Sequence, residues 1–299
     1  MNTSVATLGN VADLLAQSGF SAPAQSNNTL IRVKLLQEPI MGVEEIKGKV
    51  RNVEVVPAGY FKIEIPNKDG AVYTENLTAR VYQQRVSTYR YNANAEGSAK
   101  CVKSVMHTDL KSDLKDSNGT FNCGKSNAYI DKEEWATLDA GRQDFIKSVK
   151  RVRTVLGTSD FTNLIDASGN PVEGIGTQAF LLEVKNPESF KEVGNELSKY
   201  AKAKVLPLQH PTLFTTVKNT MHNGKTYYAI AAKADMVMTY EISDTEVETF
   251  NNFNDWVGYF NNWVMGQWQD KQEGGSSARL SSDDEATVDG FVNVDTDDE

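Results

Sequence analysis

The chain has 299 residues, of which 39% are hydrophobic and 24% charged, enough apolar material for one large domain or two small ones. Its uncharged apolar runs are only a few residues long, which excludes a membrane-spanning helix. Two cysteines are too few for a disulfide framework, and residues 1–31 lack the Lys and Arg of a secretory signal, so we expect a cytoplasmic protein.

The net charge of −9 is unevenly distributed along the chain. From Glu273 onwards there are nine acids and one base, whereas the preceding 272 residues hold 31 acids and 30 bases. We therefore expect a nearly neutral body over residues 30–271 and a disordered acidic tail over residues 272–299. A low isoelectric point caused by a tail does not argue against nucleic acid as a partner of the body.

The N-terminal region, residues 1–29, is predicted to be a short helix followed by a flexible connector. Residues 3–17 place apolar side chains at helical spacing, and residues 18–29 are small and polar. Two interpretations stay open for this helix. It can fold back on the core, or it can serve self-association, which makes a homo-oligomer one of the expected assemblies.

Strands dominate the first half of the body, because apolar and polar residues alternate there. The strands are expected at residues 30–36, 50–56, 60–65 and 76–91, with a turn at 67–70. Residues 101–123 contain a polar stretch that is typical of a surface loop or hairpin tip.

Helices and strands are mixed in the second half. Helices are expected at residues 131–147, 187–202 and 244–269, and strands at 149–156, 178–184, 213–220 and 227–240. Gly157 is interpreted as the stop of the 149–156 strand, and residues 169–176 as a loop. The last helix repeats Phe and Trp every three or four residues, which predicts a long amphipathic helix. The sequence thus indicates a strand-rich α+β protein.

One segment of the body, ARVYQQRVSTYRYN at residues 79–92, interleaves arginines with tyrosines in an expected strand. Side chains of the same parity share a face of a strand, so exposed rings can stack on bases while guanidinium groups hold phosphates. The candidate nucleic-acid-binding residues of this segment are Arg80, Tyr82, Arg85, Tyr89, Arg90 and Tyr91. The alternative is an edge strand whose tyrosines are half-buried and whose arginines are solvated.

A second basic cluster lies at residues 147–153. It adds Lys147, Lys150, Arg151 and Arg153 to the candidate nucleic-acid-binding residues. Together the two clusters can line one positive groove in an otherwise neutral body.

Metal and catalytic signals are weak. Cys101, His107 and Cys123 are three zinc-type ligands without the usual paired cysteine spacing, so free thiols and a surface histidine are the default, with zinc as the alternative. The chain contains no nucleophile elbow, phosphate-binding glycine loop or metalloprotease motif. We therefore expect no cofactor and no enzyme activity.

This organisation resembles phage-type single-stranded DNA-binding proteins. The resemblance rests on the strand-rich body, the ARVYQQRVSTYRYN segment, the 101–123 insertion and the DGFVNVDTDDE terminus. It implies an OB-like barrel core with insertions, flanking helices and a non-catalytic role in viral DNA replication or recombination.

A flexible acidic tail beside a basic groove is expected to compete for that groove and, once single-stranded DNA displaces it, to recruit replication or recombination proteins. The alternative is a tail that only keeps the protein soluble. The candidate partner-binding residues of the tail are Phe291, Asp295, Asp297, Asp298 and Glu299. The alternative function is a virion or assembly protein that uses the terminal helices for subunit contacts.

Overall fold

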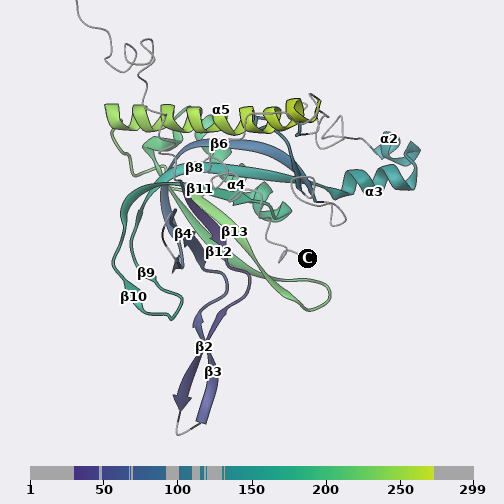
Figure 1. Ribbon diagram of the computed structural model, residues 1–299. Coiled ribbons are helices and arrows are strands. Elements are labelled where there is room, and N and C mark those ends of the chain that lie inside the picture. Colours follow the sequence, from purple (N-terminus) through teal and green to yellow (C-terminus); the bar gives the residue numbers. More distant parts are fainter. Residues whose placement is uncertain are drawn as a thin grey trace, which may run out of the picture. The chain divides into compact units, whose positions relative to one another are not determined.

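The computed structural model describes residues 30–46, 49–66, 68, 70–91, 101–109, 115–117, 119, 130 and 132–272 (Figure 1). It confirms the expected mixed α+β architecture. In chain order the elements are β1 (Ile31–Leu35), β2 (Ile40–Ile46), β3 (Lys49–Val56), β4 (Phe61–Glu64), β5 (Ala71–Thr74), β6 (Leu77–Tyr91), β7 (Cys101–Lys103), α2 (Lys132–Thr137), α3 (Ala140–Ser148), β8 (Val149–Phe161), β9 (Leu164–Ile165), β10 (Pro171–Val172), β11 (Gly176–Val184), α4 (Pro187–Ala203), η2 (Pro207–Gln209), β12 (Pro211–Thr220), β13 (Thr226–Ala234) and α5 (Asp244–Gln272). The predicted N-terminal helix and acidic tail lie outside the described residues.

Eleven strands form one large sheet in the order β10-β9-β5-β4-β1-β11-β8-β6-β12-β13, with β7 paired to β6. Strands β2 and β3 form a separate hairpin (Figure 1). Within the described residues the strand order is an open path that ends at β10 and β13, so the expected OB-like barrel is not confirmed.

Side chains cover the outer edge of β13. The Gln37 amide, just after β1, donates to the Tyr228 carbonyl and accepts from the Tyr228 N–H, both at 3.0 Å. Two α4 side chains, Ser189 Oγ and Glu196 Oε1, accept further N–H groups of β13 at 2.8 and 2.9 Å. These bonds satisfy an edge that would otherwise be open to another strand.

Helix α4 covers one face of the sheet. The Asn186 side chain caps its first turn by accepting the N–H groups of Glu188 and Ser189, and Pro187 occupies the first position, where no N–H is needed. Its apolar residues recur at helical spacing and pack against the sheet. They are Phe190, Val193, Leu197 and Tyr200, and they join a core that includes Ile31, Phe61, Val86, Val155, Phe180, Leu182, Phe214 and Ile230.

Helix α5 covers the opposite face of β6. Gln83 points to α5, where its Nε2 donates to Asn254 Oδ1 at 2.8 Å, whereas the next residue, Gln84, points to the α4 side. The Tyr82 and Phe253 rings lie 5.4 Å apart across this contact. The predicted amphipathic helix is confirmed, and its apolar stripe is buried: Phe253, Trp256, Val257, Phe260, Trp263 and Val264.

Several expected boundaries differ in the structure. The helix expected at 131–147 is two helices, because Asp139 Oδ1 accepts the N–H of Arg142 at 2.9 Å and starts α3 anew. Strand β8 continues through Gly157, where a Cβ would lie 2.6 Å from the Arg80 carbonyl oxygen. The glycine therefore permits close strand pairing and does not end the strand. Strands β2, β5, β7, β9 and β10 were not predicted.

None of the described helices is both long and apolar enough to cross a membrane.

Replacing Trp263 by alanine tests whether the α5 stripe stabilises the body. Trp263 is 9% exposed, so we expect a loss of about 3–5 kcal/mol of unfolding free energy, as for other truncated buried aromatics, measured by denaturant titration. A matched pair on the same helix controls for helix propensity: Val264→Ala (0% exposed) should destabilise, and Val247→Ala (51% exposed) should not. Equal effects of the two valine changes would contradict the packing.

Candidate nucleic-acid interface

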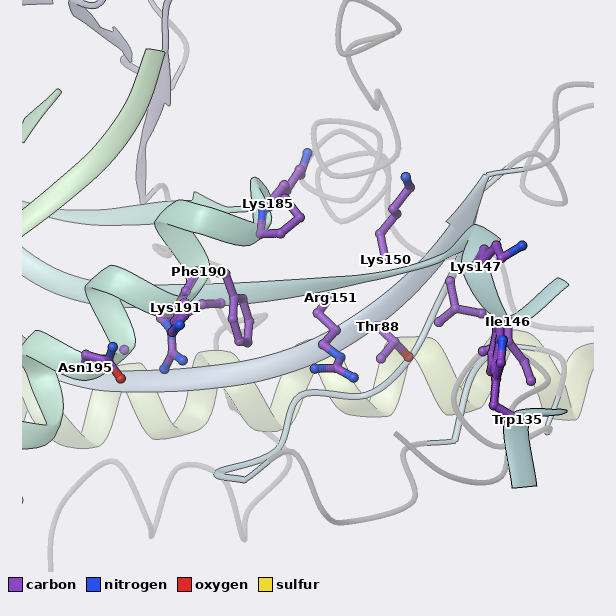
Figure 2. A pocket seen from close by; sticks show the side chains of 14 residues that line it. Thr88, Trp135, Ile146, Lys147, Lys150, Arg151, Lys185, Phe190, Lys191 and Asn195 are labelled. Atoms are coloured by element: carbon purple, nitrogen blue, oxygen red, sulfur yellow. The ribbon is translucent and has the colours of Figure 1, made fainter. Parts of the chain in front are cut away.

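A groove of about 790 Å³ lies where the first turns of α4 meet the start of β8 and the α2–α3 pair (Figure 2). Six of the described residues that line it are cations and none is an acid. The cations are Lys147, Lys150, Arg151, Arg153, Lys185 and Lys191. The second predicted basic cluster is therefore gathered in one groove, together with two lysines that sequence reasoning did not assign.

Two aromatic rings line the same groove, Phe190 from α4 and Trp135 from α2. Figure 2 shows Phe190, Arg151 and Thr88 in succession along the groove, with Trp135 near its far end. The half-buried Trp135 ring lies 5.9 Å from the Lys147 ammonium, close enough for a cation–π contact. The Gln143 amide donates to the Trp135 carbonyl at 3.1 Å, and this bond ties α2 to α3.

Arg153 forms the floor of the groove and is not free to hold a phosphate. Its Nη1 donates to Gln84 Oε1 at 2.5 Å, its Nε donates to the Phe190 carbonyl at 3.1 Å, and its guanidinium stacks over the Phe190 ring at 4.4 Å. A Cβ at Gly194 would collide with this guanidinium, so the helix has a glycine there. Burial lowers the pKa of Arg153 from its ordinary value. The predicted phosphate contact is therefore wrong for Arg153, because the residue joins β8 to α4.

Among the described residues, two carboxylates adjoin the groove. Asp144 Oδ1 lies 3.2 Å from the Lys147 ammonium. Glu183 Oε2 lies 3.4 Å from the Lys185 ammonium. Burial by itself would raise the pKa of Glu183, but the charges of Lys185, Lys103 and Arg32 outweigh burial and lower that pKa to about 2. Glu183 thus stays ionised near neutral pH and orients Lys185 beside the groove.

Three residues of the first predicted cluster lie beneath α5 and its preceding connector. Tyr82 is 6% exposed, and burial raises its pKa. Arg80 donates to the Leu208 carbonyl at 3.0 Å and to Glu246 at 2.9 Å, and Arg85 Nη2 lies 3.4 Å from Asn254 Oδ1. The burial of Tyr82 contradicts its assignment to an exposed binding face, whereas Arg80 and Arg85 are half-buried and bonded to α5 or its connector.

The physical reason is a register shift between Val81 and Gln83, where β6 bulges against β8. A bulge adds one residue and reverses the parity of the side chains that follow it. Tyr82 at the bulge and Arg85 beyond it therefore both face α5. Strict alternation along the strand would place these two side chains on opposite faces.

The last part of β6 approaches the groove. Thr88 lines it, and the half-buried Tyr89 ring lies 5.9 Å from the Lys185 ammonium. Arg90 stacks over the Phe145 ring of α3 at 4.8 Å, and Tyr91 is half-buried at the end of the strand. Tyr89 and Arg90 thus contact groove or α3 residues, and none of the three predicted residues lines the groove.

The zinc alternative finds no support among the described residues, where no three His, Cys, Asp or Glu side chains gather as a metal site. Cys101 is buried, and His107 Nδ1 lies 3.1 Å from Asp109 Oδ2. Cys123 and the tail residues Phe291, Asp295, Asp297, Asp298 and Glu299 lie outside the described residues.

Sequence reasoning missed Trp135, Phe190, Lys185, Lys191 and Gly194. Two signals were available. Trp135 is a lone large aromatic in a short polar helix that buries no residue, and Gly194 interrupts an otherwise good helix, which often marks a close packing contact.

No protein-family model, curated protein or solved structure matches this chain.

Proposed function

We propose that this chain is a non-catalytic single-stranded DNA-binding protein that acts in viral DNA replication or recombination. The observation that carries the proposal is the groove, which gathers two aromatic rings and five cations besides the internally bonded Arg153, and has no acid among its described lining residues. The proposal does not need the OB-like barrel that the resemblance implied, because the groove is built by α4, β8 and the α2–α3 pair.

The combination of charge and rings favours a single strand over a duplex. Phosphates bind lysine and arginine in either form, but the flat faces of bases are free to stack only when the bases are unpaired. Trp135 is the ring best placed to stack, because one face of Phe190 is already covered by Arg153.

The acidic tail supplies the proposed regulation. It holds nine acids and one base, and it follows α5 in the same chain, so it competes with DNA for the groove at high effective concentration. DNA that displaces the tail makes its acidic terminus available to replication or recombination proteins.

The alternative function is a virion or assembly protein. The α5 stripe is buried against its own chain and cannot be the predicted subunit contact in this state. The β2–β3 hairpin, however, exposes Met41, Val43 and Val50, which a partner could cover.

A salt titration tests the groove. For single strands the slope of log affinity against log salt changes by about 0.7 for each phosphate contact. We expect the double variant Lys150→Gln and Lys191→Gln to weaken oligonucleotide binding and to flatten this slope by about 1.4. The control, Lys218→Gln with Lys225→Gln, changes the charge equally on exposed residues outside the groove. Identical slopes in the two double variants would exclude the groove as the binding site.

Replacing Trp135 tests stacking. Trp135→Ala should cost about 1–3 kcal/mol of binding free energy to a single-stranded oligonucleotide, with little preference among sequences, because every base has a stacking face. Fluorescence anisotropy measures the affinity. The salt slope should stay unchanged, since no charge is lost, and Trp135→Phe should restore part of the affinity. An unchanged affinity in Trp135→Ala would remove the ring from the interface.

Deleting residues 274–299 tests the tail. The deletion removes eight acids and one base, so oligonucleotide binding should tighten most at low salt, where charges are least screened. The gain should shrink as salt rises. Thermal unfolding of the truncated protein serves as the stability control. An affinity equal to that of the full chain at low salt would show that the tail does not compete for the groove.

A further inference from the structure

A second surface lies away from the groove, on the connector between β13 and α5 and on the first turns of α5. It exposes six apolar side chains, and Val237 is 92% exposed. We call this surface the connector patch. Its residues are Met236, Val237, Met238, Ile242, Val247 and Phe250. Clusters of exposed apolar side chains on a folded protein commonly mark interaction sites, and methionines adapt to varied partners.

The connector is held in one conformation by its backbone. Asp235 Oδ1 accepts two successive N–H groups of the connector, at 2.9 and 3.1 Å. The His210 ring bonds the Met238 carbonyl at 2.9 Å, and Arg80 donates to the Glu241 carbonyl at 3.0 Å. The apolar side chains are therefore presented by an ordered backbone, which lowers the entropy cost of binding a partner.

The charge around the patch is negative. From Asp235 to Asp255 the sequence holds six acids and no base. Two cations lie near this stretch: Arg80 is already paired with Glu246 at 2.9 Å, and Lys233 of β13 lies close enough to lower the pKa of Asp235. A partner that covers this surface must bury apolar groups and bring positive charge.

We propose that the connector patch is a docking site for a basic amphipathic helix of a partner protein. The apolar face of such a helix covers Val237, Met238 and Phe250, and its Lys and Arg side chains meet the surrounding carboxylates. In such recognition of an amphipathic helix, affinity comes from the apolar anchors and the register of the helix from the charges.

The patch and the groove lie at opposite ends of β6. Arg80 supports the connector, and Thr88 lines the groove eight residues further along the strand, about 26 Å away at the usual rise of a strand. Figure 1 shows the start of α5 and the α2–α3 pair correspondingly far apart. The docking site does not rest on the proposed DNA binding, and both surfaces can be occupied together.

The test uses the full chain and a fluorescein-labelled 18-residue amphipathic peptide of leucine and lysine as the probe. Two double variants of the patch, Val237→Ser with Met238→Ser and Glu241→Gln with Glu248→Gln, should each weaken peptide binding about tenfold, equivalent to about 1.4 kcal/mol. The matched hairpin controls, Met41→Ser with Val43→Ser and Glu44→Gln with Glu45→Gln, should bind the peptide like the parent. Hydrogen exchange should show peptide-dependent protection at residues 236–250.

Equal peptide affinities in the patch and hairpin variants would overturn the proposal and assign the peptide to another acidic region such as the tail. A change of oligomeric size on Val237→Ser with Met238→Ser would also overturn it, because the patch would then be a contact between copies. Oligonucleotide binding should be the same in all four variants, so a failure of this proposal is distinguishable from a failure of the groove.

Discussion

Strand β6 is covered on both faces, and its single bulge sets the arrangement of both helices. At the bulge Tyr82 points to α5, and the next residue, Gln83, also points to α5 while Gln84 points to α4. A strand covered on both sides needs polar partners for each buried polar side chain, because an unpaired buried group costs free energy. Asn254 accepts a bond from Gln83 Nε2 on one face, although Gln83 Oε1 has no hydrogen-bond partner, and Arg153 donates to Gln84 on the other.

Arg153 connects the covered strand β6 to the groove. Its buried guanidinium bonds Gln84 on β6 and the Phe190 carbonyl on α4, so one side chain fixes the helix against two strands. Gly194 makes room for it. A buried cation is costly unless its donors are satisfied, and here the bonds to Gln84 and Phe190, with the Phe190 ring beneath, offset that cost. The cations at the surface of the groove then lie on a rigid support.

The charges of the molecule are separated in space as well as along the chain. The groove concentrates cations at one end of β6, and the connector patch combines acids with apolar side chains at the other. The net charge of the body, which is close to zero, conceals this separation. A protein with this arrangement can bind an anionic polymer at one site and a cationic partner at another, which suits the proposed function of holding a single strand while other replication proteins act on it.

The sequence by itself determined the elements whose signals are local. Periodicity located α4 and α5, alternation located β1, β3, β6 and β11, and charge counting separated the tail from the body. It also identified the 147–153 cluster, because four cations within seven residues stay close in any fold. The sequence could not determine which face of β6 is open, since the bulge reverses parity and α5 arrives from more than 160 residues away in the chain. Only the tertiary structure buried Tyr82, paired Arg80 with Glu246 of α5, and brought Trp135, Phe190 and Lys185 beside the basic cluster. Those contacts join segments far apart in sequence, and no local pattern of residues encodes them.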